Sequence, residues 1–217
     1  MTNRAVAALL FLMLGLCACT YRLPRKPSEP ELPPEMREQA WLLHLRQTVQ
    51  LTTFRIEGRM AIRTSQEAGT VGLLWEQHNA AFQVITRGPL GQTLGRLAGD
   101  EQGAEMTLAG RQPMRSDSTE KLLYRLTGTR LPFRCLTFWL RGVPDSGQPF
   151  EYTLTGAGRL ATLHQNGWAI RYGNYRQVGD QWLPKRMRAE REGAVMVLSV
   201  HHWRLSAPTL VSADEQQ

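Results

Sequence analysis

Apolar and polar residues alternate along much of this chain with a period of two. In the segment 54–62, the apolar side chains are those of Phe54, Ile56, Met60 and Ile62, and the positions between them are mostly charged. Successive side chains of a β-strand point to opposite faces of the sheet. The segment therefore predicts a strand with one buried face and one face in solvent.

Further strands are predicted between turn signals rich in glycine, asparagine and aspartate. They lie around residues 71–75, 82–84, 94, 106–108, 168–172, 183–190 and 194–205. The dipeptide Asn166-Gly167 is a strong hairpin signal, and the His78-Asn79 pair marks another turn. Strands this closely spaced pair antiparallel, so we expect a mainly β fold in which about ten or eleven strands form one large curled sheet.

Three stretches have helical periodicity instead. A helix is expected from Pro34 to about Leu51, and a second from Asp117, as the N-cap of a capping box with Glu120, to Gly128. A third begins at Pro132 and stops before Gly142. The last two are short and one-sided, so their apolar faces must lie on the inner face of the sheet. They either complete a filled core or form a lid over a cavity for an apolar ligand.

The N-terminus resembles a bacterial lipoprotein signal. One positive charge at Arg4 precedes an apolar run over 5–16, which is too short to span a bilayer comfortably and typical of a secretory signal. The run ends in Leu16-Cys17-Ala18-Cys19, which resembles a lipobox with Cys19 as the lipidated residue. The alternative is an ordinary signal peptide with incidental cysteines. By resemblance to Gram-negative lipoproteins, a residue other than Asp after Cys19 implies sorting to the outer membrane.

These signals divide the chain into four parts. We expect a signal peptide over 1–18, the lipidated Cys19 with a proline-rich tether over 19–33, a single domain over 34–207 and a polar tail over 208–217. Cys135 would be the one cysteine left in the domain, which excludes an internal disulfide, and we expect it to be a buried filler.

Charge and motif content limit the classes of function. The formal net charge is +7, or +6 once residues 1–18 are removed, which favours an anionic membrane or an acidic protein partner. The charges are scattered, and a periplasmic domain rarely meets nucleic acid, so no nucleic-acid partner is expected. Residues 156–161, GAGRLA, match a dinucleotide fingerprint only superficially, and the five histidines have no metal-ligand spacing. We therefore expect no enzyme activity, metal or cofactor, with a lipid or cell-wall hydrolase as the remaining enzyme alternative.

Several motifs together resemble the LolB family of outer-membrane lipoprotein receptors. They are LTGTRLP, FWLRGVP, QNGWAIRYGNY and WLPKRM, together with the lipobox and the GPLG turn at 88–91. The resemblance implies an unclosed antiparallel β-barrel with a helical lid over a hydrophobic cavity. It also implies a monomer that accepts lipoproteins from the periplasmic carrier LolA and inserts them into the outer membrane without ATP. Another amphiphile-binding lipoprotein or a scaffold remains the alternative.

Such a transfer needs a dry container, because each exposed methylene costs about 0.8 kcal/mol in water. The candidates for the acyl-chain cavity and its lid are Phe54, Ile56, Met60, Trp75, Phe82, Val84, Leu94, Leu122, Leu126, Leu136, Trp139, Leu140, Trp168 and Ile170. About half of them are expected to be plain core.

The GPLG turn carries the last candidate site. In the family, the exposed apolar residue of this turn promotes membrane insertion, and Leu90 occupies that position between Gly88, Pro89 and Gly91. Burial of Leu90 in lipid would contribute about 1.5–3 kcal/mol, enough to orient the domain but not to anchor it. The alternative is a leucine that folds back onto the domain.

Overall fold

The computed structural model describes residues 31–205, which form one 11-stranded antiparallel sheet with three helices. The signal peptide, Cys19, most of the tether and the polar tail lie outside the described residues. In chain order, the elements are α2 (Pro34–Val49), β1 (Thr53–Arg63), β2 (Ala68–His78), β3 (Ala81–Arg87), β4 (Thr93–Asp100), β5 (Gly103–Leu108), β6 (Met114–Ser116), α3 (Thr119–Thr127), α4 (Phe133–Leu140), β7 (Phe150–Leu154), β8 (Leu160–Gln165), β9 (Trp168–Val178), β10 (Gln181–Arg191) and β11 (Ala194–Leu205).

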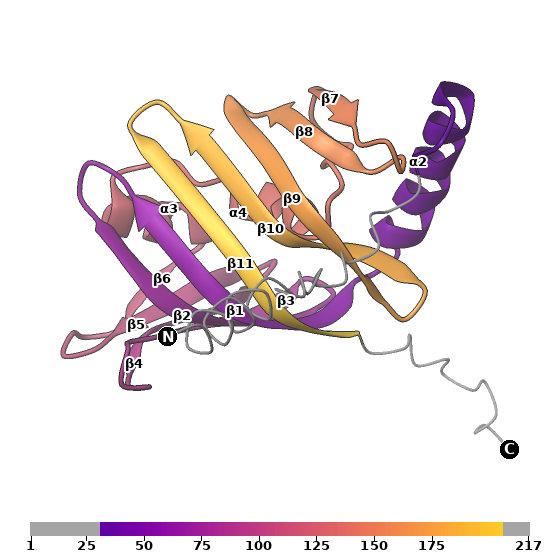
Figure 1. Cartoon of the computed structure of the whole chain (residues 1–217). Coiled ribbons are helices and arrows are strands. Elements are labelled where there is room, and N and C mark those ends of the chain that lie inside the picture. The colour runs from indigo at the N-terminus through magenta and orange to yellow at the C-terminus, as the bar shows by residue number, and fades with distance from the viewer. Residues whose placement is uncertain (1–30, 206–217) are drawn as a thin grey trace, which may run out of the picture. The chain divides into compact units, whose positions relative to one another are not determined.

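The sheet consists of two meanders joined by its first and last strands. Its order is β6-β5-β4-β3-β2-β1-β11-β10-β9-β8-β7, and β6 and β7 form the two unpaired ends. The barrel is therefore not closed. Figure 1 shows α3 and α4 behind the strands β1, β11 and β10, whereas α2 lies beside β7 and β8. The prediction of a curled, unclosed antiparallel sheet with an N-terminal helix and two short covering helices is confirmed.

Turn chemistry fixes the register of several hairpins. Asn79 has a φ of 54° between β2 and β3, and Asn166 and Gly167 have φ values of 52° and 72° between β8 and β9. Asparagine and glycine tolerate this left-handed conformation, which two-residue hairpin turns require. Both predicted turns therefore stand where the sequence indicates them.

A bulge bends the sheet at the junction of the two meanders. The register between β1 and β11 shifts between Glu57 and Gly58, so that the inward side chains of β11 change from even to odd positions beyond His201. Gly58 is required by close approach, because a Cβ atom there would lie 2.2 Å from the carbonyl oxygen of Ser199.

The ends of α3 differ in one respect from the prediction. Gly128 ends the helix with a φ of 65° and donates its N–H to the Tyr124 carbonyl at 2.8 Å, as expected. The N-cap, however, is Ser118, whose Oγ accepts from the Lys121 N–H, and not Asp117. Ser118 has the extended backbone that an N-cap needs, and the Asp117 carboxylate binds the Lys121 ammonium at 2.9 Å instead.

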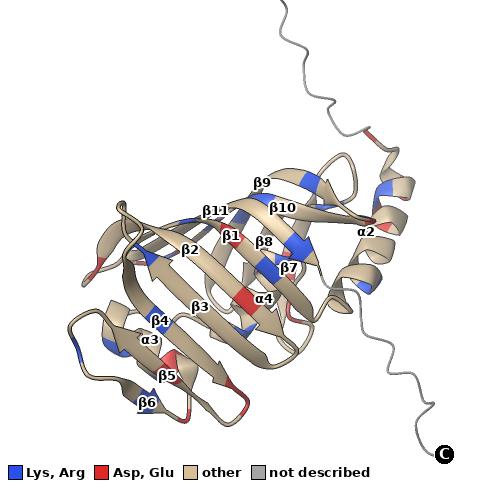
Figure 2. Cartoon of the chain, turned by 90° about the horizontal axis from the view of Figure 1, so that it is seen from below, with Lys and Arg blue, Asp and Glu red and all other residues tan. Residues whose placement is uncertain are grey.

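The two covering helices are held differently. On α4, Trp139 packs on Trp168 with ring centroids 6.4 Å apart, and its Nε1 donates to Gln165 Oε1 at 2.8 Å. Gln165 Nε2 in turn donates to the Asp145 carbonyl at 2.7 Å, which completes a buried polar network. By contrast, α3 packs mainly on β5 and β6 at one end of the sheet, as Figure 2 shows. The side of the interior next to β8 and β9 is therefore solid and fixed, whereas α3 covers the opposite side.

Candidate functional site: an apolar cavity and an exposed turn

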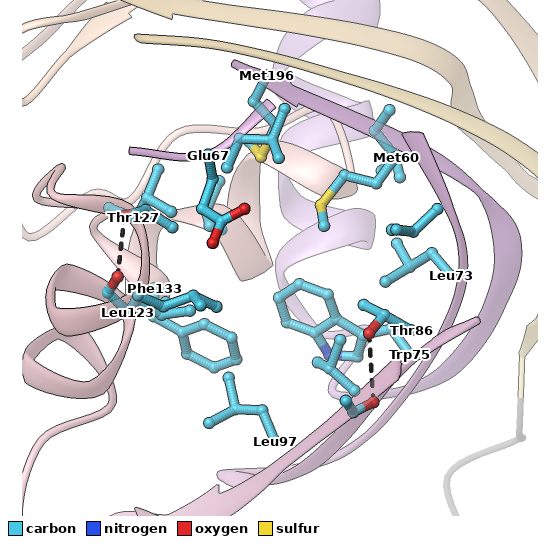
Figure 3. Close-up of a pocket in the computed structure, with 18 of the residues that line it drawn as sticks. Met60, Glu67, Leu73, Trp75, Thr86, Leu97, Leu123, Thr127, Phe133 and Met196 are labelled. Carbon is cyan, nitrogen blue, oxygen red and sulfur yellow. Dashed lines mark hydrogen bonds between the residues drawn. The ribbon is translucent and has the colours of Figure 1, made fainter. Parts of the chain in front are cut away.

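A cavity of about 240 Å³ lies between the two covering helices and the strands on the β2 to β5 side of the interior. Figure 3 shows Leu123 and Phe133 of the helices facing Leu73, Trp75 and Leu97 of the sheet. The lining comprises Met60, Ile62, Glu67, Val71, Leu73, Trp75, Val84, Thr86, Gly95, Arg96, Leu97, Met106, Leu108, Leu123, Leu126, Thr127, Leu131, Phe133, Leu136, Leu140, Met187, Met196 and Leu198. A wall of this composition suits an apolar ligand.

The few polar groups in the wall are occupied or exposed. Thr86 Oγ1 donates to the Gly95 carbonyl at 3.3 Å, and Thr127 Oγ1 donates to the Leu123 carbonyl at 2.9 Å, as the dashed lines in Figure 3 indicate. Glu67 is solvent-exposed. A ligand in the cavity would therefore meet almost only hydrocarbon and sulfur, so the site offers burial rather than reaction chemistry.

Phe133 fills the space between α4 and the sheet. Its ring stacks on Trp75 with centroids 4.9 Å apart and planes inclined by 9°, and it lies 4.3 Å from the ring of Phe82. Such aromatic pairs contribute about 0.5–1.5 kcal/mol beyond the area that they bury. Because Phe133 is the first residue of α4, displacement of this helix end would enlarge the cavity.

Six of the residues that the sequence singles out as cavity or lid candidates belong to the lining. They are Met60, Trp75, Val84, Leu126, Leu136 and Leu140. The other eight, Phe54, Ile56, Phe82, Leu94, Leu122, Trp139, Trp168 and Ile170, lie outside it. Except for Leu94, these eight are buried residues of the core. These buried residues are packed in the core without contact to this cavity, and Phe54 and Phe82 border a separate, more polar pocket next to Arg141.

Leu94 requires a separate correction, because it does not share the inward orientation of the lining residues. Gly95 and Leu97 of β4 contact the cavity, and Leu94 is three residues from Leu97. Residues an odd number apart on a strand point to opposite faces. The register also shifts here, since Thr86 pairs with Gly95 whereas Arg87 pairs with Thr93, so Leu94 is the extra residue of a bulge.

Most of the remaining lining was not singled out from the sequence. Met187, Met196 and Leu198 come from β10 and β11, and Phe133 comes from the start of α4. The sequence predicted strands over 183–190 and 194–205, but only the sheet order brings these strands to the β1 side of the cavity. Phe133 had a local signal in its position directly after Pro132, at the start of the third predicted helix.

The GPLG turn stands out from the rest of the surface. Leu90 is 93% exposed, whereas Leu43, the next most exposed large apolar residue within 31–205, is 56% exposed. The Gly91 N–H donates to the Gly88 carbonyl at 3.0 Å, and Gly91 has a φ of 83°. These features define a tight turn with Pro89 and Leu90 at its tip. Leu90 does not fold back onto the domain.

A buried arginine joins α4 to the end of α2. The Arg141 guanidinium donates to the Thr48 carbonyl at 3.1 Å and the Leu51 carbonyl at 2.7 Å, and it lies 4.8 Å from the ring of Phe138. The side chain thus satisfies carbonyls at a helix C-terminus, where a positive charge is favourable. Burial lowers the pKa of Arg141 to about 10, so it remains charged at neutral pH.

Two further buried groups have shifted pKa values. Burial, with a contribution from the Arg159 charge, lowers the pKa of His44 to about 4 and keeps its ring neutral. Burial next to Asp145 raises the pKa of the Cys135 thiol to about 11, so this thiol is protonated and unreactive at neutral pH.

Within residues 31–205, no cluster of three or more histidine, cysteine or acidic residues could hold a metal ion. No helix in the same range is long and apolar enough to cross a membrane.

Comparisons with known proteins agree with this geometry. Residues 52–203 match the family model described as outer membrane lipoprotein LolB. The chain is 32% identical to the outer-membrane lipoprotein LolB of Pseudomonas paraeruginosa over 166 residues, which cover 76% of this chain and 81% of that protein. The identity and both coverages are the same for the LolB of Pseudomonas putida GB-1.

A solved structure supports the fold. The crystal structure of a DUF1329 family protein from Desulfovibrio piger shares 12% sequence identity with a TM-score of 0.52, and the match covers 83% of this chain and 95% of that one. This likeness concerns the fold alone. From the family model and the relatives, the chain belongs to the LolB family of outer membrane lipoproteins.

Proposed function

We propose that this protein receives the acyl chains of lipoproteins from a LolA-like periplasmic carrier and places them in the outer membrane without ATP. The observation that carries the proposal is the apolar cavity of about 240 Å³ between an unclosed sheet and two short helices. In this proposal, lipid on Cys19 anchors the protein, the domain faces the periplasm, and the protein acts as a monomer. The family, whose relatives are named outer-membrane lipoproteins, supports this role.

The size of the cavity implies that the protein opens when it takes its cargo. Pockets that enclose a drug-sized ligand usually measure about 300–1,000 Å³, and a lipoprotein carries several acyl chains. The C-terminal end of α4 is held by the hydrogen bond from Trp139 to Gln165. The parts expected to move are therefore α3 and the N-terminal end of α4 at Phe133. An isolated helix of this length is marginal in water, so displacement of α3 loses little besides the contacts of its apolar face.

Transfer without ATP requires only that affinities increase along the route. Each buried methylene contributes about 0.8 kcal/mol, so small differences in burial between the carrier, this cavity and the bilayer determine the direction. Met60, Met187 and Met196 in the wall suit this task, because unbranched, polarizable side chains adapt to acyl chains of different shape.

In this scheme, Leu90 acts at the last step, the release of the cargo into the membrane. Its side chain is almost fully exposed at the tip of a tight turn, so its burial in lipid would contribute about 1.5–3 kcal/mol and orient the domain on the bilayer. The experiment is a two-step transfer assay with a lipoprotein-loaded carrier, the full chain and outer-membrane vesicles. Leu90→Glu should accept lipoprotein at the normal rate and deliver it poorly, with an unchanged free energy of unfolding.

The matched control is Leu43→Glu on α2, where a leucine that is also exposed should be dispensable for both steps. Normal delivery by Leu90→Glu would remove Leu90 from the mechanism. Failure of the unmodified protein to take any lipoprotein from the carrier would contradict the proposed function itself. In that case, a binder of another amphiphile or a scaffold would be the better description.

A further inference from the structure

Three arginines lie in a single line across the outer face of the sheet. Arg87 of β3 pairs with Gly72, which pairs with Arg59 of β1. Arg59 pairs with Ser199, and Ser199 pairs with Arg186 of β10. The arginines thus occupy every second strand, and since neighbouring strands are about 4.8 Å apart, they recur about every 10 Å. We refer to Arg87, Arg59 and Arg186 as the arginine row.

The arginine row points away from the cavity. Each of its members is followed or preceded along the strand by a residue that lines the cavity: Thr86 beside Arg87, Met60 beside Arg59 and Met187 beside Arg186. Adjacent residues of a strand face opposite sides, so the three guanidinium groups extend from the convex side. All three side chains belong to exposed residues.

Small residues separate the arginines. A Cβ atom at Gly72 would lie 3.5 Å from the Cβ atom of Arg87, and one at Gly173, which pairs with Arg186 on its other side, would lie 3.9 Å from the Arg186 Cβ. Together with Ser199, these glycines leave the arginines as the largest side chains in the row. No larger side chain of the row therefore stands between the guanidinium groups and a charged surface that approaches the sheet from this side.

Within residues 31–205, none of the three guanidinium groups forms a hydrogen bond or an ion pair, in contrast to neighbouring arginines. Glu57 binds Arg55 at 3.0 Å. Glu190 binds Arg171 at 2.8 Å and also contacts Arg188. The carboxylates that flank the row on the outer face are thus engaged by other arginines, and the row retains its positive charge. Figure 2 shows basic residues on several strands of the sheet.

We propose that the arginine row binds the phosphate groups of anionic lipids in the outer membrane and holds the convex face of the sheet against the bilayer during delivery. Arg87 directly precedes Gly88 of the Leu90 turn. The arginine row therefore begins next to Leu90, the one almost fully exposed large apolar residue within the described part of the chain. Guanidinium groups bind phosphates through two parallel hydrogen bonds.

The features of the row favour a membrane over a protein partner. A specific protein interface usually has an apolar centre within about 800 Å² on each partner, whereas the residues between the arginines are glycine and serine. An apolar tip next to exposed cations is typical of docking at a lipid interface. The inference rests on the proposed function in one respect, which is that the Leu90 turn meets the membrane.

The experiment measures how close the sheet lies to lipid. The full chain, inserted through its own lipid anchor into vesicles, carries a fluorophore on Thr70→Cys, an exposed position two residues from Gly72 on the same strand. Quenching by a nitroxide lipid is compared between phosphatidylcholine vesicles and vesicles that also contain phosphatidylglycerol. A second label at Gln102→Cys, in the turn between β4 and β5, serves as the position remote from the row.

Quenching at position 70 should be strong only in the anionic vesicles, and weak at position 102 in both. Each of Arg59→Gln, Arg87→Gln and Arg186→Gln should lower the ratio of docked to undocked protein about fivefold, the equivalent of about 1 kcal/mol at 1.4 kcal/mol per tenfold. The matched control, Arg46→Gln at an exposed position in the last turn of α2, should change nothing.

Two results would overturn the inference. Equal quenching in zwitterionic phosphatidylcholine vesicles and in anionic vesicles would exclude recognition of anionic lipids. Reduced capture from the carrier by the three glutamine variants, with quenching unchanged, would assign the row to a protein partner. Failure of this inference is separable from failure of the proposed function, because uptake from the carrier is measured independently of docking.

Discussion

The free space behind α3 and Phe133 leads to a prediction about stability that ordinary cores do not share. Val84 lines the cavity, whereas Val143 is fully buried outside it. The same substitution by phenylalanine should therefore have opposite effects at the two positions. At Val84, the added ring carbons enter vacant apolar space, whereas at Val143 they must displace packed neighbours.

The magnitudes follow from burial and packing. At about 0.8 kcal/mol for each added carbon, Val84→Phe can raise the free energy of unfolding by at most about 3 kcal/mol, and we expect a change between zero and that limit. Overpacking by Val143→Phe should lower the free energy of unfolding by about 1–3 kcal/mol. Urea unfolding followed by tryptophan fluorescence measures both values.

The affinity for an apolar ligand should fall in Val84→Phe, the variant whose stability is expected to be retained or raised. A polyene fatty acid, whose fluorescence reports its burial, should bind Val84→Phe about tenfold more weakly, because the new ring removes room for about two methylenes. Its affinity for Val143→Phe should equal that of the unmodified protein. If Val84→Phe loses as much stability as Val143→Phe, the space is not vacant and the reasoning fails.

Two further predictions concern Arg141 and His44, two buried basic side chains with lowered pKa values. Arg141→Met leaves carbonyls at the end of α2 unpaired and should lower the free energy of unfolding by about 2–4 kcal/mol. The control, Arg125→Met at an exposed position on α3, should change the free energy of unfolding by no more than about 0.5 kcal/mol. An equal effect of the two substitutions in urea unfolding would contradict the joining role of Arg141. The pKa of His44 is lowered to about 4 in the folded protein, whereas in the unfolded chain the imidazole takes up a proton near pH 6.5. The free energy of unfolding should therefore fall by about 3 kcal/mol as the pH drops from about 6.5 to 4. Replacement of His44 by glutamine should remove this part of the pH dependence and the same change at exposed His164 should not, as measured by unfolding at several pH values.

Much of the sheet is predictable from local patterns. The alternation that begins at Phe54 and the Asn166-Gly167 turn specify β1, β8 and β9, since one buried face imposes a period of two and a left-handed turn imposes a hairpin. The short edge strands β6 and β7 have no such signal, and no strand was predicted at 114–116 or 150–154. An edge strand of few residues depends on its neighbour rather than on its own pattern.

The cavity was less predictable than the sheet. Ile56 and Met60 are both apolar, inward positions of one strand, yet only Met60 contacts free space. The difference depends on where the covering helices stop, which is set by long-range packing such as that of Trp139 on Trp168. Leu90 is the opposite case, because glycine and proline around it predict an exposed turn without reference to the rest of the fold.

In the proposed function, the space under α3 and α4 receives acyl chains. The direct measurement is the amount of acylated lipoprotein that moves from a loaded carrier to the full chain when no nucleotide is present, for the unmodified protein, Val84→Phe and Val143→Phe. We expect the unmodified protein and Val143→Phe to take up equivalent amounts, and Val84→Phe, although folded, to take up far less. Equal uptake by all three proteins, or none by any, would contradict this expectation.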